Sequence, residues 1–504
     1  MNYTSFIKKS QNRFQVFCTV LRFSLFIGFY LLCLWMVFLY VVNAPHNMVV
    51  FSLTALGGIA ILSWLHIRIS LGCLIIGVPV VSALHMMKIF PVNPLCFWFA
   101  ILYLSWCTKC LLWQKKTVAS HSHVGALVDI LAGLVLLSLI RTLFHHPFDY
   151  LWDRLWYHPV ITGPDDPMFC LYAAFVLLQG LFLYRIIELE VDDSTGWKKM
   201  VWVFYLQAAL VIFFSLLQLF FQIPPLEKTY LTRLYSPFND IHSYGSYIVL
   251  LFFFFLALTS TKNRSQGLIT AVCSGILFLL VMLSWSRETW VAALLTGMIF
   301  LFYKLKKTRA FLFVVSIFIA VALVNLVPSL WPDSKNLYVK RLESTVIVKK
   351  INVEIRKCLW CRAVGIIKEY PVAGSGIGTF YKISPSYGER DCERFKGRPE
   401  NAHNYYLQVA AEIGVSGLLL FLSIIFCAYR SGLRTLSQLE ESDNIITGLL
   451  FGLTAYLITM LAGHPLLLPN QQLLFWFVIA AITIPGRLGT YEKIPSTGDI
   501  QIEG

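Results

Sequence analysis

Charged residues are scarce in this chain. Only 13% of its 504 residues are Asp, Glu, Lys or Arg, whereas a soluble protein typically carries about a quarter. Hydrophobic residues make up 57% of the chain, and only lipid can cover so large an apolar surplus. This composition excludes a soluble globular protein. We expect an all-α polytopic membrane protein of about 12–14 transmembrane helices.

Other features are missing as well. Lys8, Lys9 and Arg13 precede an apolar stretch from Phe17 to Val42, which is too long for a signal peptide and is followed by no small-residue cleavage site. We interpret it as a first span that stays in place. No cysteine or histidine pattern has zinc spacing, and no basic-aromatic module suits nucleic acid. We therefore expect no metal, no cofactor and no nucleic-acid partner.

Apolar segments recur along the chain with one long break. A bilayer core needs about 20 apolar residues per helix. Candidate spans are 20–42, 48–64, 70–87, 95–113, 126–142, 167–187, 200–222, 241–260, 267–285, 289–304, 310–328, 407–428, 445–463 and 470–486. The division that follows is N-terminal transmembrane helices (1–328), a large outer loop (329–406), C-terminal transmembrane helices (407–486) and a polar tail (487–504).

Basic residues in the short loops set the orientation, because cytoplasmic loops are enriched in Lys and Arg. With the N-terminus in the cytoplasm, clusters such as Lys115-Lys116 and Lys306-Lys307 lie inside. An even number of spans returns the C-terminus to the cytoplasm. The loop 329–406 then lies outside. It is basic, and since long loops translocate regardless of charge, an anionic ligand is one explanation.

Within the outer loop, the spacing predicts an amphipathic helix over 353–370. Its apolar positions are Val353, Leu359, Ala363, Ile366 and Ile367. Pro371 ends it, and a Gly-Ser-Gly-Ile-Gly turn (374–378) follows. No strand–turn–helix unit surrounds this turn, so it resembles a phosphate loop only superficially. We expect a flexible turn, with an alternative in which its backbone amides face an anion.

Three polar signals stand beside predicted span ends. His403-Asn404 comes just before a span, Arg287 lies in a turn between two spans, and Arg233 precedes Asn239-Asp240. Each has a simple structural explanation. The histidine could bond to backbone, Arg287 could pair with Glu288, and Asn239 or Asp240 could cap the next helix.

These three polar segments all lie on the same predicted side of the membrane, although the topology was derived from other charged residues. Arg233, Arg287 and His403 all fall on the outer surface. Two guanidinium groups can bind a diphosphate bidentately. An imidazole beside them can take a proton from a hydroxyl. These two guanidinium groups and the imidazole together favour an enzyme that transfers a group from a membrane-bound diphosphate.

At these residues the chain resembles the O-antigen ligase and polymerase superfamily of bacterial inner-membrane glycosyltransferases. The ligase-type motif is His-Asn, nine residues, Gly, two residues and Gly, which matches His403-Asn404, Gly414 and Gly417. Weaker matches are Ser286-Arg287, the stretch 371–380 with its glycines and final Phe380, and Arg233 followed by Asn239.

The resemblance implies transfer of an O-antigen or related glycan from undecaprenyl diphosphate to lipid A-core, at the periplasmic face of a Gram-negative inner membrane. Arg233 and Arg287 would bind the diphosphate, and His403 would be the general base. Supporting residues would be Asn404, Asn239, Gly376, Glu412, Gly414 and Gly417. Because the periplasm is oxidising, we also expect a disulfide from Cys392 to Cys358 or Cys361.

Other functions stay open. A chain polymerase or a protein O-oligosaccharyltransferase would use similar chemistry. A polysaccharide transporter or flippase would place ionisable residues or broken helices at the bilayer midplane. The predicted spans look nearly free of central charges, with Glu412 as the main exception, and this pattern favours surface chemistry over transport.

Overall fold

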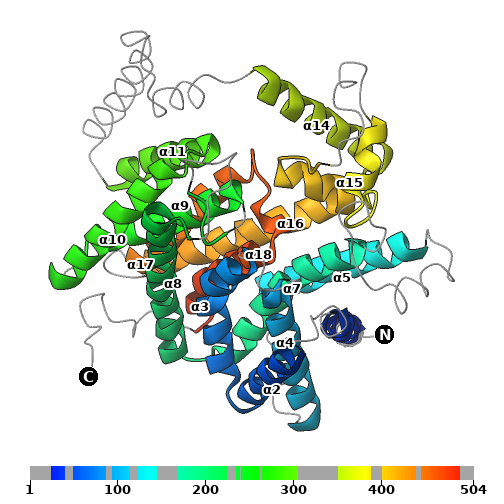
Figure 1. Cartoon of the computed structure of the whole chain (residues 1–504), viewed down its shortest axis with the longest axis horizontal. Helices are drawn as coiled ribbons and strands as arrows, with labels where there is room; N and C mark the ends of the chain where they lie inside the picture. The colour runs from blue at the N-terminus through cyan, green and yellow to red at the C-terminus, as the bar shows by residue number, and fades with distance from the viewer. Residues whose placement is uncertain are drawn as a thin grey trace, which may run out of the picture.

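The computed structural model of the chain describes residues 24–39, 49–86, 93–113, 122–144, 169–223, 234–238, 240–261, 264–304, 350–387, 400–438 and 444–488. Every regular element in these ranges is a helix (Figure 1). After a first helix at Ser24–Leu39 come α2 (Val49–Leu65), α3 (Ile67–Met86), α4 (Pro94–Trp113), α5 (His123–Phe144), α7 (Phe169–Glu190), α8 (Ser194–Phe221), α9 (Ile241–Leu258), α10 (Arg264–Leu283), α11 (Arg287–Lys304), α14 (Lys350–Glu369), α15 (Phe380–Ile383), η3 (Ser384–Tyr387), α16 (Tyr405–Gln438), α17 (Asn444–Thr459), η5 (Pro465–Leu467) and α18 (Pro469–Leu488).

The helices confirm the predicted all-α polytopic membrane protein. Eight of them are long and apolar enough to cross a bilayer, namely α3, α4, α5, α7, α8, α9, α10 and α16. Ser24–Leu39 and α17 are shorter apolar helices. The predicted span 310–328 lies outside the described residues.

Three helices form the centre of the bundle. In the most apolar 18-residue stretch of each helix, 89% of α7 and 83% of α9 is buried inside the molecule, but only 28% of α10. In α18, the run from Leu473 to Ile482 is buried throughout. α18 packs against α7, and α17 packs against α9. Side chains of the central helices therefore meet other helices, whereas α10 presents most of its surface outward, where lipid would lie.

The amphipathic helix predicted in the outer loop is confirmed as α14. It lies at one edge of the molecule, near α15 (Figure 1). Leu359, Ala363 and Ile366 are buried, and the last two pack with Phe380 and Ala411 in a small separate core. The loop thus docks on the first turns of α16. The side chain of Val353, also predicted to be apolar contact surface, lies outside the described residues.

Gly414 divides α16 into two straight segments. Its φ of 85° and ψ of 172° are not helical and lie in a region that essentially only glycine adopts. The kink brings the backbone of α16 against the turn after α14, where Val415 N–H donates to the Pro371 carbonyl (2.8 Å). The first motif glycine therefore permits close contact between α16 and a loop.

Besides Glu412, ionisable residues occur inside the bundle near the start of α5 and the end of α7. Arg185 of α7 is 1% exposed and lies 3.0 Å from Asp129 of α5, and it also pairs with Glu188. Gly125 provides space for this cluster, since a Cβ there would overlap Arg185 Nη1. The charges are paired with one another, which is how buried charges are normally tolerated.

Candidate functional site

His403 adopts a backbone conformation that is unusual for a residue with a side chain. Its φ is 46°, a left-handed value that costs about 1–3 kcal/mol where the surroundings impose it. The side-chain oxygen of Asn401 accepts the His403 N–H (2.9 Å). Asn404 caps α16 by accepting the Leu407 N–H (3.1 Å). Asparagines on both sides thus fix His403 at the start of the helix.

Three histidines from separate elements meet at this point. His242 is in the first turn of α9, and His464 precedes η5. The ring centroid of His403 lies 5.1 Å from that of His464 and 6.1 Å from that of His242. His242 and His464 are 6.3 Å apart. We call these three residues the histidine cluster.

Charged residues adjoin one end of the histidine cluster. His242 Nδ1 contacts Glu288 of α11, and Arg356 of α14 lies 3.6 Å from the same carboxylate. Asp240 caps α9 by accepting the Ser243 N–H (2.7 Å). Glu288 thus pairs with His242 and Arg356 rather than with its neighbour Arg287, among the residues that the structure describes.

Burial keeps two of the imidazoles neutral. Desolvation, together with the nearby His464, His242 and Arg356, lowers the pKa of His403 to about 3, although Glu288 opposes them. Desolvation also lowers the pKa of His464 to about 4, against the attraction of Asp240. A neutral imidazole has a free lone pair, so His403 can accept a proton at physiological pH.

Arg287 begins α11, two residues after a second strained residue. Trp285 has a φ of 51°. A non-glycine residue with positive φ thus lies near Arg287, just as His403 itself has a positive φ. Arg287 is half-buried, and its positive charge is close enough to that of Arg356 for the two to repel each other. An anion between these guanidinium groups would relieve that repulsion.

The predicted phosphate-binding Arg233 and the predicted supporting residue Asn239 lie outside the described residues. Their neighbour Asp240 is the residue that caps α9. The structure therefore brings His403 together with the first turn of α11. The second predicted diphosphate-binding arginine stays a prediction.

The glycine-rich turn is held by hydrogen bonds, so the prediction of a flexible turn is wrong. Gly376 N–H donates to the Glu412 carbonyl (3.0 Å), and Gly378 N–H donates to the Glu412 carboxylate (3.0 Å). Ile377 N–H donates to Ser138 of α5 (2.9 Å). Because these amides already have acceptors within the protein, the alternative in which they face an anionic ligand is wrong too.

Glu412 connects this turn to α16. Its carboxylate accepts the Phe380 N–H (3.3 Å) and the side chain of Gln408 (2.9 Å), besides the Gly378 N–H. Gln408 in turn accepts the Ala402 N–H (2.9 Å), one residue before His403. Glu412 therefore supports His403 indirectly, through Gln408 and the backbone of Ala402.

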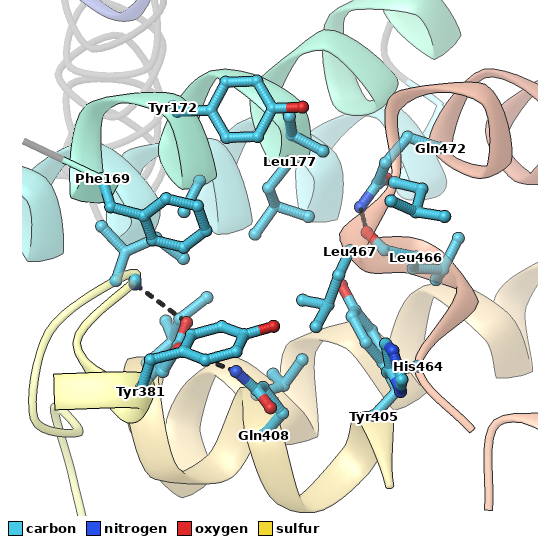
Figure 2. Close-up of a pocket in the computed structure, with 18 residues that line it drawn as sticks. Phe169, Tyr172, Leu177, Tyr381, Tyr405, Gln408, His464, Leu466, Leu467 and Gln472 are labelled. Carbon is cyan, nitrogen blue, oxygen red and sulfur yellow. Dashed lines mark hydrogen bonds between the residues drawn. The ribbon is translucent and has the colours of Figure 1, made fainter. Parts of the chain in front are cut away.

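A cavity of about 220 Å³ opens beside the histidine cluster. Figure 2 shows its walls, which come from α7, the glycine-rich turn, α16 and the segment from His464 to Gln472. The aromatic side chains in the wall are those of Phe169, Tyr172, Tyr381 and Tyr405. Among the described residues that line the cavity there is no Lys or Arg. His464 belongs to both the cavity wall and the cluster.

Of the outer-loop cysteines, Cys358 forms a disulfide and Cys361 is free. No other cysteine in the described part of the chain forms a disulfide, so the partner of Cys358 lies outside it. Cys392, which is not described, stays the predicted partner. Among the described residues, no group of His, Cys, Asp and Glu is arranged to hold a metal ion.

Sequence reasoning missed His242, His464, Arg356 and the role of Glu288. His464 lies between the last two predicted spans, in a turn that the predicted topology places outside. The predicted position on the outer surface, which selected Arg287 and His403, would have selected His464 as well. Arg356 was one of many basic residues in the outer loop, and no local pattern distinguishes it.

Comparison with known proteins identifies the region that carries the site. No curated protein matches the chain. The O-antigen ligase family model matches residues 272–422, a segment that includes Arg287, Glu288, Arg356, His403 and Glu412. This part of the chain is thus similar to the O-antigen ligase family.

Proposed function

We propose that the protein transfers a glycan from undecaprenyl diphosphate to lipid A-core at the periplasmic face of the inner membrane. The observation that carries this proposal is the position of His403. A neutral imidazole lies at the end of a membrane helix, in one cluster with Glu288 and Arg356 and near Arg287. A proton acceptor is thus combined with cations that suit a diphosphate.

In this mechanism Arg287 binds the diphosphate together with Arg233, as the family resemblance implies. Arg356 becomes a further candidate, because it faces the same region from α14. Planar guanidinium groups can each offer two parallel N–H donors to phosphate oxygens. Glu288 limits the positive charge around the site and orients Arg356 and His242.

The chemical step exchanges one glycosidic bond for another. The acceptor hydroxyl passes its proton to a ring nitrogen of His403 as its oxygen bonds to the anomeric carbon of the donor. The bond from that carbon to the phosphate oxygen breaks, and the diphosphate leaves on its lipid with the bonding electrons. The Nδ1 atom of His403 is buried and has no hydrogen-bond partner in the described part of the chain, so it can take the proton.

Complementation of a deletion strain tests the proposal. The His403→Ala protein should reach the membrane and lose about 10²–10⁴-fold in activity, as is typical for a missing general base. His66→Ala is the matched control, since His66 is exposed in the turn between α2 and α3, away from the cluster. Cells with His403→Ala should accumulate long glycan on the lipid carrier beside bare lipid A-core.

Two other phenotypes would contradict ligation. Lipid A-core bearing a single repeat unit would identify a polymerase. Donor that builds up on the cytoplasmic face, with little effect of His403→Ala, would identify a transporter. Retention of full transfer activity by purified His403→Ala would remove the base from the mechanism.

A further inference from the structure

His464 connects the histidine cluster to the cavity. Its ring lies 5.1 Å from that of His403, and it is one of the residues that line the cavity. Figure 2 places it at the edge of the cavity, next to Tyr405. A group bound in the cavity and reaching toward His403 would therefore pass His464.

The hydrogen bonds around Asn401 identify which nitrogen of His464 carries the proton. Asn401 Oδ1 accepts the backbone N–H of His403 (2.9 Å), so the other end of that amide is its NH₂ group. This NH₂ lies 3.0 Å from His464 Nε2. Since NH₂ can only donate, Nε2 must be the acceptor, and a neutral His464 carries its proton on Nδ1.

The resulting Nδ1–H is a buried donor with nothing to bind. Nδ1 of His464 has no hydrogen-bond partner in the described part of the protein, although a buried donor without a partner costs about 1–3 kcal/mol. Buried polar groups are nearly always satisfied, and an exception calls for a missing ligand. The missing partner must be an acceptor, such as an oxygen atom.

The cavity wall indicates what kind of molecule supplies that oxygen. Its described residues include no cation, and the one carboxylate among them, Glu412, already accepts three hydrogen bonds. A diphosphate would find no countercharge there. Tyr172, Tyr381 and Tyr405 instead offer aromatic surface and hydroxyl groups, which suit a neutral ring with both apolar and polar faces.

We propose that the cavity binds a sugar ring of the acceptor glycan and that His464 Nδ1–H donates a hydrogen bond to one of its oxygens. This inference rests on the proposed transferase function. The cations adjoin the cluster at Glu288 and the cavity adjoins it at His464. If the diphosphate leaves toward the cations, an acceptor held in the cavity presents its hydroxyl to His403 from the other end.

Kinetics of two His464 variants test this assignment. Asn can replace the Nδ1 donor of histidine, whereas Phe fills a similar space without a donor. The probes are the glycan-loaded undecaprenyl diphosphate and the lipid A-core extracted from the source cells. At saturating donor, His464→Phe should raise the KM for lipid A-core about tenfold, the equivalent of about 1.4 kcal/mol. His464→Asn should stay within about threefold of wild type, and both variants should keep the wild-type KM for donor.

A second variant tests the cavity without touching the histidine. Val176 lines the cavity from α7, and Val176→Phe should narrow it and also raise the KM for lipid A-core. Melting curves in detergent should show that each variant is folded. A rise in the KM for donor alone would assign the cavity to the lipid carrier and overturn the proposal.

The remaining outcomes separate this inference from the proposed function. An unchanged acceptor KM in His464→Phe, with active wild type, would refute the role of His464 alone. A drop in kcat at unchanged acceptor KM would mean that His464 Nδ1–H donates its hydrogen bond to the leaving group. That result would also refute the role of His464 in binding the acceptor. A wild-type protein that transfers no glycan to lipid A-core would instead reject the proposed function.

Discussion

Gly414→Ala should detach the glycine-rich turn from α16. At φ 85° and ψ 172° an alanine is strained by about 1–3 kcal/mol. Its Cβ would also overlap the carbonyl group of Val372 and approach Ala373 N at 2.8 Å. Both obstacles are backbone atoms, so no side chain can rotate to make space, and the turn must move.

Movement of the turn would break the hydrogen bonds that fix it. The two nearest are Val415 N–H to the Pro371 carbonyl (2.8 Å) and Gly376 N–H to the Glu412 carbonyl (3.0 Å). Each contributes about 0.5–1.5 kcal/mol. With the backbone strain, the total loss of stability is roughly 2–6 kcal/mol. The cavity wall formed by Ile377 and Gly378 would be displaced as well.

The assay compares thermal unfolding in detergent with transfer activity. Gly414→Ala should melt several degrees below wild type and transfer little glycan. Gly275→Ala in α10 is the control, because its Cβ would meet nothing within 4 Å and alanine stabilises an exposed helix by about 0.5–1 kcal/mol. Wild-type melting and activity in Gly414→Ala would refute the argument that this glycine holds the turn.

Three further predictions concern the site, and one concerns the outer loop. Activity of the purified protein should survive EDTA, because guanidinium groups can offset the diphosphate charge; loss in EDTA with recovery in Mg²⁺ would contradict this. Since the pKa of His403 is lowered to about 3, kcat/KM should stay level as the pH falls through 6.5, and an acid limb centred near 6.5 would count against a neutral base. Cysteines introduced beside Arg287 and His403 should react with an impermeant thiol reagent from outside, whereas one at Lys306 should not; protection at either outer site would break the shared sidedness. Non-reducing peptide mapping should join Cys358 to Cys392, and a free thiol at Cys392 would disprove that pairing.

The fold class could be predicted because it depends on composition and spacing within short segments. Apolar runs of span length predict helices wherever they occur, and helical spacing of Leu359, Ala363 and Ile366 was enough to predict α14. Both signals lie within about 20 residues of the chain. The paired charges of Asp129 and Arg185 were missed because their partnership joins two helices far apart in sequence.

The site was only half predictable for the same reason. His403 and Arg287 stand at span ends beside recognisable motifs, so sidedness brought them together. His242, His464 and Arg356 acquire their roles from tertiary contacts. The glycine-rich turn shows the reverse error. Its three glycines suggested a flexible turn, but groups on α5 and α16 fix it.

A base with a pKa of about 3 would be weak if nothing else changed, and the site geometry suggests what changes. In the proposed mechanism the diphosphate brings negative charge close to the histidine cluster. One net negative charge at about 5 Å, at an effective dielectric constant of about 20, stabilises an imidazolium by roughly 3 kcal/mol. That raises the pKa by about two units. Two such charges, partly offset by the arginines, would bring His403 toward the working pH of a general base.

Donor binding would thus strengthen the base that activates the acceptor. Before the donor arrives, burial, the neighbouring imidazoles and Arg356 keep His403 unprotonated and weakly basic. The lone pair is therefore available, but it has little power to activate a stray hydroxyl. Glu288 supports the site both before and after the donor binds, because it pairs with Arg356 and with His242. Its negative charge reduces the repulsion between the cations. The same charges that bind the diphosphate would in this way make proton transfer depend on its presence.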